Sequence, residues 1–243
     1  MFLNKNKLIV IFALFLMVGT VHGATFNEFN PNIWFIPSIQ FSNEVVISPT
    51  NGTISDALKV SDDVLLLPGT YTGEGNTNIN ITGNKRVHAT DPGTVIIDGE
   101  GKIKLFNVEE NSSLNLTNLI LTGGNDSTGD GGAIFSNGSL NINDCILENN
   151  TANTGGSVYI NNSLFSFVNT MILNNTGINS SDKGLIGAGA GIYIDGCNGS
   201  IENTTFENNG DLDPNSYVYG SGLVINGTFN VIVLNKNILS NIF

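Results

Sequence analysis

Two pairs of adjacent carboxylates are the side chains in this sequence that come nearest to an acid–base pair. They are Asp62-Asp63, which precede an apolar run, and Glu109-Glu110, which precede Asn111. Hydrolysis of a glycosidic bond needs two carboxyl groups that converge on one sugar, with one of them held protonated. Each pair stands where a loop or turn is expected. We therefore interpret both pairs as polar loop residues and predict no catalytic residue.

A short basic segment offers the other route to proton abstraction. Arg86 is the only arginine, and Lys85 and His88 lie close to it in the sequence. An Arg86 that removed a proton would need a carboxylate such as Asp91 or Asp98 stacked near it. We expect instead that Arg86 lies in an exposed turn. No Ser–His–Asp set can be placed around His88 by spacing.

Aspartates in segments rich in Gly, Ser and Asn are candidate calcium ligands, because Ca²⁺ is bound by carboxylate and carbonyl oxygens. They are Asp126, Asp130, Asp182, Asp195, Asp211 and Asp213. The run from Asp126 to Gly131 resembles a calcium loop but lacks the bidentate glutamate at its end. We predict no metal site and no cofactor, and keep ordered calcium as the alternative.

The composition favours an all-β chain with many turns. Of the 243 residues, 29 are glycine and 38 are asparagine, and asparagine favours turns over helix interiors. Only 12% are charged, which disfavours both a charge-rich disordered chain and a helical bundle. The formal net charge of −12 disfavours binding to nucleic acid, which requires Lys and Arg along the phosphates.

The first residues indicate export. Lys5 and Lys7 precede an apolar run over 8–18, and Val21-His22-Gly23 places small residues before Ala24. This pattern is typical of a secretory signal peptide, and the run is too short to span a membrane. We predict a signal peptide over residues 1–23 and a secreted or cell-surface protein.

The two cysteines have two interpretations. An exported chain could oxidise Cys145 and Cys197 to a disulfide. The two residues occupy different columns of the repeat described next, so we prefer two separate buried thiols.

Internal repetition is the strongest signal in the sequence. One apolar column contains Leu121, Leu147, Leu173, Phe206 and Leu239. A second apolar column, five positions earlier, contains Leu116, Ile142, Val168, Ile201 and Leu234. A turn column, two positions after the first, contains Gly123, Asn149, Asn175, Asn208 and Asn241. Another set of short strands, each with a small residue at its start, covers 132–135, 156–159, 190–193 and 221–224.

Strands this short bury an apolar face only when equivalent strands of successive repeats stack at about 4.8 Å. We therefore predict a right-handed parallel β-helix over 61–243, in which stacked asparagines form amide ladders at the corners. The extra residues of 175–190 and 209–221 are expected to protrude as loops. The chain is too short for a β-propeller, and an antiparallel sandwich fits the columns less well.

The segment before the coil is predicted to act as its cap. Thr53-Ile54-Ser55-Asp56 resembles a capping box, and apolar residues follow at helical spacing. We assign residues 24–60 to an N-terminal cap region with one short helix, followed by a strand over Val64 to Leu67. Trp34 is interpreted as a packing residue within this region.

Several of these motifs resemble known families. The run from Thr53 to Tyr71, with the later segment 95–99, resembles the start of secreted pectin-lyase-like β-helix domains. The segments 131–134 and 206–209 resemble the two short motifs of chlamydial polymorphic outer-membrane protein repeats. The combination with an Asn-rich coil and a signal peptide is most similar to adhesin-like surface proteins of methanogenic archaea. The resemblance implies a β-helix, a fold that also hosts polysaccharide lyases and hydrolases.

We predict a non-catalytic, adhesin-like binding protein whose loops contact surface glycans or proteins. Its candidate contact residues include Tyr159, Tyr193, Tyr217 and Tyr219. The alternative is a polysaccharide lyase or hydrolase of the pectin-lyase-like fold. The apolar segments 231–234 and 238–239 run almost to Phe243 without a polar cap. They predict end-to-end self-association or a fragment of a longer protein.

Overall fold

A computed structural model describes residues 43–178, 189–210, 222–227, 231–234 and 238–240 of the chain, with backbone only for 231–234 and 238–240. The predicted signal peptide and Trp34 therefore lie outside the described residues. So do most of the two predicted loops, with Asp182, Asp211, Asp213, Tyr217 and Tyr219.

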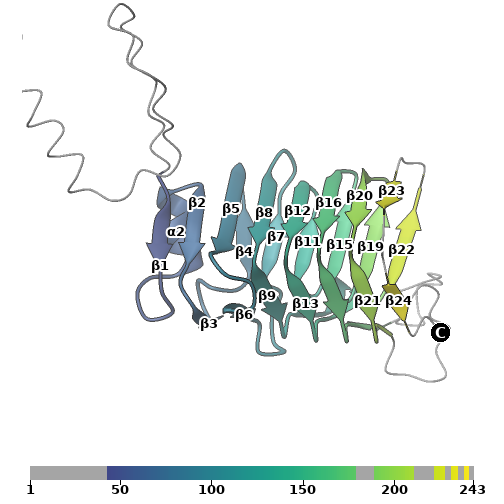
Figure 1. Ribbon diagram of the computed structural model, residues 1–243, viewed down its shortest axis with the longest axis horizontal. Coiled ribbons are helices and arrows are strands. Elements are labelled where there is room, and N and C mark those ends of the chain that lie inside the picture. The colour runs from purple at the N-terminus through teal and green to yellow at the C-terminus, as the bar shows by residue number, and fades with distance from the viewer. Residues whose placement is uncertain (1–42, 179–188, 211–221, 228–230, 235–237, 241–243) are drawn as a thin grey trace, which may run out of the picture. The chain divides into compact units, whose positions relative to one another are not determined.

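The described chain forms a parallel β-solenoid of four sheets (Figure 1). An eight-stranded sheet contains β1 (Val45–Ile47), β2 (Asp63–Leu66), β5 (Asn84–Ala89), β8 (Ser113–Thr117), β12 (Ser139–Asn143), β16 (Leu164–Val168), β20 (Asn198–Glu202) and β23 (Val231–Leu234). A seven-stranded sheet contains β3 (Gly69–Thr72), β6 (Val95–Asp98), β9 (Leu119–Thr122), β13 (Ile146–Glu148), β17 (Met171–Leu173), β21 (Thr205–Glu207) and β24 (Ile238–Ser240). The strand pairings within all four sheets are parallel, which confirms the predicted β-helix.

The two remaining sheets complete each coil. A six-stranded sheet contains β4 (Ile79–Ile81), β7 (Phe106–Val108), β11 (Ile134–Ser136), β15 (Val158–Asn161), β19 (Ile192–Asp195) and β22 (Leu223–Asn226). A three-stranded sheet contains β10 (Asn125–Asp130), β14 (Thr151–Thr154) and β18 (Thr176–Gly177). Among the described strands, β22, β23 and β24 are the last of their sheets, and end-to-end self-association stays a prediction.

The predicted apolar columns slip by one residue at β16, β17 and β23. Leu147 pairs with Ile172, whereas the sequence spacing predicted Leu173. Ile172 is fully buried and Leu173 only partly, because alternate side chains of a strand face opposite sides. The same shift replaces Val168 by Phe167, Asn175 by Asn174 and Leu234 by Val233 in the other columns. Met171-Ile172-Leu173 is apolar throughout, so hydrophobicity alone could not choose the inward residue.

Asparagines occupy the left-handed turn positions of the coil, as predicted from their abundance. The asparagines with positive φ are Asn78, Asn111, Asn118, Asn149, Asn162, Asn169, Asn174, Asn203 and Asn208. Asparagine tolerates this backbone region better than other residues with a Cβ, because its short polar side chain bonds to the local backbone. The repeated asparagines therefore allow the chain to turn sharply between strands.

A second row of asparagines is buried just after these turns. Asn150, Asn175 and Asn209 are almost completely inaccessible. The Nδ2 of Asn150 donates to the Oδ1 of Asn175 at 3.1 Å, and the Nδ2 of Asn175 donates to the Oδ1 of Asn209 at 2.9 Å. The same amides donate to the backbone oxygens of Leu121 and Leu147. This is the predicted amide ladder, and it satisfies polar groups that the corner would otherwise bury unpaired.

Small residues before β11, β15 and β19 are required by close backbone approach. A Cβ at Gly132 would collide with the carbonyl oxygen of Gly156, and one at Gly156 with that of Ala190. A Cβ at Gly191 would collide with the carbonyl of Gly222. The repeated glycines thus let successive coils pack at strand spacing.

One short helix, α2 (Ile54–Val60), lies near the N-terminal end of the described coil (Figure 1). The Oγ1 of Thr53 accepts a hydrogen bond from the Asp56 backbone N–H at 3.2 Å, which confirms the predicted cap. Three apolar side chains of the helix are buried: Ile54, Ala57 and Leu58. β1, which lies within the predicted cap region, pairs with β2 and so begins the eight-stranded sheet. The described residues include no helix with the length and apolar character that a bilayer crossing demands.

The two cysteines are separate thiols, as preferred from the sequence. Cys145 and Cys197 are both free and buried. Burial raises the pKa of Cys145 to about 12 and also raises the pKa of Cys197. Both sulfurs are therefore protonated at neutral pH.

Candidate functional site

Two ion pairs join the first coils of the solenoid. β2 pairs with β5 so that Asp63 lies opposite Arg86, and Arg86 Nη1 is 3.3 Å from Asp63 Oδ2. Lys85 Nζ is 2.6 Å from Asp62 Oδ1 and donates to the backbone oxygen of Leu58 at 2.7 Å. A cation beside the last turn of α2 also interacts favourably with the helix dipole. Each of these two cations is thus paired with a carboxylate.

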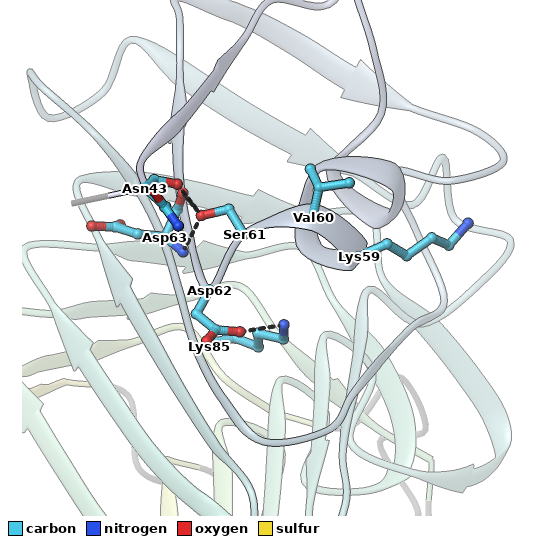
Figure 2. A pocket seen from close by; sticks show the side chains of 7 residues that line it. All are labelled: Asn43, Lys59, Val60, Ser61, Asp62, Asp63 and Lys85. Carbon is cyan, nitrogen blue, oxygen red and sulfur yellow. Dashed lines mark hydrogen bonds and ion pairs between the residues drawn. The ribbon is translucent and has the colours of Figure 1, made fainter. Parts of the chain in front are cut away.

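A hollow of about 320 Å³ lies beside these pairs, next to the C-terminal end of α2 (Figure 2). Its lining residues are Asn43, Lys59, Val60, Ser61, Asp62, Asp63 and Lys85. Figure 2 shows Asp62 against Lys85, while Asp63 lies on the other side, near Asn43. The Ser61 hydroxyl is within hydrogen-bond distance of the backbone oxygens of Asn43 and Asp63. The two adjacent carboxylates therefore do not converge on one point, as hydrolysis of a sugar bond would require.

His88 lies between two carboxylates from different segments. Its Nε2 is 3.1 Å from Glu44 Oε1 and 3.2 Å from Asp63 Oδ1. The His88 side chain is only 10% exposed. Nε2 is within hydrogen-bond distance of Glu44, whereas Asp63 Oδ1, an atom sealed from solvent, has no hydrogen-bond partner. Sequence reasoning missed Glu44, which stands outside every repeat column.

The structure places the basic residues Lys85, Arg86 and His88 in a strand, whereas the sequence predicted a turn at Arg86. Arg86 is exposed, as expected, but it lies within strand β5, so the expected turn is wrong. The carboxylate that Arg86 contacts is Asp63. Asp98 Oδ1 instead accepts the Glu100 backbone N–H at 2.7 Å, and Asp91 offers its backbone oxygen to Thr94. Arg86 contacts Asp63 because β2 pairs with β5, and the spacing of residues along the sequence does not reveal this pairing.

Glu109 and Glu110 are exposed residues between β7 and β8, as expected for a turn. Three of the candidate calcium ligands lie in strands rather than loops: Asp126 and Asp130 in β10 and Asp195 in β19. Asp126 Oδ2 is 2.9 Å from Lys104 Nζ, so this carboxylate already has a cationic partner.

The outward side of the six-stranded sheet carries a stack of three aromatic rings. Strand pairing places Phe135 opposite Tyr159, and Tyr159 opposite Tyr193. Their ring centroids are 5.5 and 5.3 Å apart, and the planes differ by only 7° and 6°. We call these residues the aromatic column. The small-residue strands of the sequence predicted their alignment, and the parallel register makes the rings stack.

Charged groups surround the aromatic column. Lys104 Nζ lies 5.0 Å from the centroid of Phe135, a cation–π contact at one end of the stack. Burial and the charges of Asp195 and Asp130 raise the pKa of Tyr159 to about 12. The pKa of Tyr193 is raised by the same causes. Both phenol groups therefore remain protonated donors well above neutral pH.

A polar row lies two residues further along each strand, on the same outward side. We call it the amide column, and it contains Asn137, Asn161, Asp195 and Asn226. Asn161 Nδ2 donates to Asn137 Oδ1 at 3.4 Å, and Asn226 Nδ2 donates to Asp195 Oδ1 at 3.0 Å. The two columns together form a surface of phenol hydroxyls, ring edges and amides.

Comparison with known proteins supplies one structural neighbour. No protein-family model matches the chain, and no curated protein matches it. A solved structure of a mutant of AlyGC, a PL6-family alginate lyase, is similar, with 15% sequence identity and a TM-score of 0.39. The match covers 85% of this chain and 41% of the lyase chain, so this chain spans less than half of that protein.

Proposed function

We propose that this chain is a non-catalytic, adhesin-like binding scaffold, exported from the cell, that contacts a neutral glycan. The observation that carries the proposal is the outward surface formed by the aromatic and amide columns. Glycan recognition needs polar groups that fix hydroxyls, set beside apolar or aromatic surface. The phenol groups of Tyr159 and Tyr193 and the amide of Asn161 supply these elements on neighbouring strands.

The geometry of the rings determines how a glycan would bind. Each face of Tyr159 is covered by a neighbouring ring, at 5.5 Å for Phe135 and 5.3 Å for Tyr193. Sugar rings cannot stack on covered faces. Contact would therefore occur through the tyrosine hydroxyls, the ring edges and the amides. Hydrogen bonds of this kind recur at the strand spacing, which suits a polymer with repeated hydroxyls.

The charge distribution favours a neutral glycan over an acidic one. The chain carries a formal net charge of −12, and Asp130 and Asp195 act electrostatically on the tyrosines. A polyuronate would be repelled by such a field. Every lysine and arginine among the described residues is already held in an ion pair with a carboxylate.

The alternative is a polysaccharide lyase, for which the basic segment is the candidate site. Lys85 lines a solvent-accessible hollow, and Arg86 contacts Asp63, another of its lining residues, which supports this alternative. Their ion pairs with Asp63 and Asp62 weigh against it. A lyase would release unsaturated uronate, which a binding protein would not.

The test is binding to immobilised neutral and acidic polysaccharides, with product release measured on the same samples. We expect retention on a neutral glycan, no release, and an affinity about tenfold lower in the Tyr159→Phe/Tyr193→Phe double variant, the loss of about 1.4 kcal/mol. These changes keep both rings and remove only the hydroxyls. Ser166→Ala, an outward change on the eight-stranded sheet, is the matched control. Equal binding by the double variant, or release of unsaturated uronate, would contradict the proposal.

A further inference from the structure

The environment of His88 leaves one carboxylate oxygen without a partner. His88 Nε2 is within hydrogen-bond distance of Glu44 Oε1, at 3.1 Å. Asp63 Oδ1 is 3.2 Å from the same nitrogen but receives no hydrogen bond, although this atom is sealed from solvent. Buried polar atoms are rarely left unpaired in native proteins. An orphaned carboxylate oxygen beside an imidazole nitrogen is thus a feature that needs an explanation.

A metal ion would satisfy all three atoms at once. Glu44, Asp63 and His88 each offer one ligand atom, and these three atoms lie within 4.8 Å of one another. Ligand atoms at about 2.0–2.2 Å from a tetrahedral ion lie about 3.4 Å from each other. The two distances to Nε2, 3.1 and 3.2 Å, are close to that spacing. We propose that Glu44, Asp63 and His88 bind a divalent transition-metal ion of the Zn²⁺ type.

The donor set selects the class of ion. Calcium and magnesium prefer oxygen ligands alone, whereas zinc readily takes imidazole nitrogen together with carboxylate oxygen. Two carboxylates and a neutral imidazole balance the two positive charges of the ion. This site is distinct from the candidate calcium aspartates, of which Asp126 is paired with Lys104.

Neighbouring residues hold the ligands without competing for the ion. Arg86 Nη1 contacts Asp63 Oδ2, at 3.3 Å, which fixes the carboxylate and leaves Oδ1 for the metal. Such outer contacts orient first ligands in known metal sites. Glu44 is on the exposed side of the cluster, so a fourth position is open to water. The ion would tie the residue before β1 to β2 and β5.

The test is calorimetric titration of the untagged, metal-free protein with zinc chloride, and separately with calcium chloride. We expect one Zn²⁺ per chain and no saturable calcium binding at this site. Bound Zn²⁺ should raise the melting temperature and slow amide exchange over residues 43–47. His88→Gln and Glu44→Gln should each weaken Zn²⁺ binding by about tenfold or more.

The chain offers a matched control for Glu44→Gln in Glu110, an exposed glutamate outside the cluster. Glu110→Gln should leave the Zn²⁺ affinity unchanged. Circular dichroism of each variant checks that the β-solenoid is intact, and either of the two ligand variants that folds suffices for the comparison. Absence of 1:1 Zn²⁺ binding, or binding unchanged in a folded ligand variant, would overturn the proposal.

Discussion

The first coils of the solenoid and its later coils are held together by different polar interactions. Ion pairs connect α2, β2 and β5, including Lys85 with Asp62 and Arg86 with Asp63. Beyond residue 130, no ion pair occurs among the described residues. There the side chains of Asn150, Asn175 and Asn209 form a buried ladder of hydrogen bonds between coils. The change falls within the repeat, whose columns begin at Leu116 and Leu121.

The difference follows from stacking equivalent residues at strand spacing. A column of like charges at about 4.8 Å would repel itself, whereas a column of amides donates and accepts along its length. Regular coils therefore use neutral asparagine at repeated positions. Charges are tolerated where equivalent positions of successive coils carry different residues, because an acid can then lie opposite a base, as Asp63 does Arg86.

The largest expected effect concerns the apolar interior of the later coils. Ile172→Ala should lower the free energy of unfolding by about 2–5 kcal/mol, since Ile172 is fully buried. Leu173→Ala should cost less than about 1 kcal/mol, because Leu173 is only partly buried. Urea denaturation of both variants measures the difference. Equal losses, or the reverse order, would contradict the register described for β17.

An intermediate effect is expected for the buried amide ladder. Asn175→Ala would leave the Asn150 backbone N–H and the Leu147 oxygen without their bonds. We expect a loss of about 2–3 kcal/mol of unfolding free energy. Asn141→Ala, an exposed asparagine control, and Arg86→Gln, which breaks a half-exposed ion pair, should each cost less than about 1 kcal/mol. A larger loss in Arg86→Gln than in Asn175→Ala would reverse the proposed contrast between the two regions.

The smallest effect is a pH dependence that originates in the later coils. Burial raises the pKa of Cys145 to about 12, against about 8.5 for an unfolded thiol. Between these values the unfolded chain loses a proton that the folded chain keeps, so stability falls as pH rises. The slope reaches about 1.4 kcal/mol per pH unit for one such group. Denaturation at pH 8 and pH 9 should show a smaller decline in Cys145→Ala than in the unchanged protein.

The sequence by itself determined the class of fold and much of its local structure. Apolar columns, the short strands with small residues before them, and abundant asparagine all favoured a parallel coil, because each residue type suits one recurrent position. The helix cap at Thr53 and the alignment of Phe135 with Tyr159 were also predictable from local pattern. Separate buried thiols followed from the different columns of Cys145 and Cys197.

Only the tertiary structure decided the register of β17 and the partners of the charged residues. Met171, Ile172 and Leu173 are all apolar, so the hydrophobic pattern does not show which of them faces inward. The pairing of β17 with β13 and β21 determines that Ile172 does. Glu44 belongs to no repeat, so nothing in the pattern connected it with His88 and Asp63. Strand pairing brought these three residues together, because contacts between coils depend on the path of the whole backbone and not on spacing along the chain.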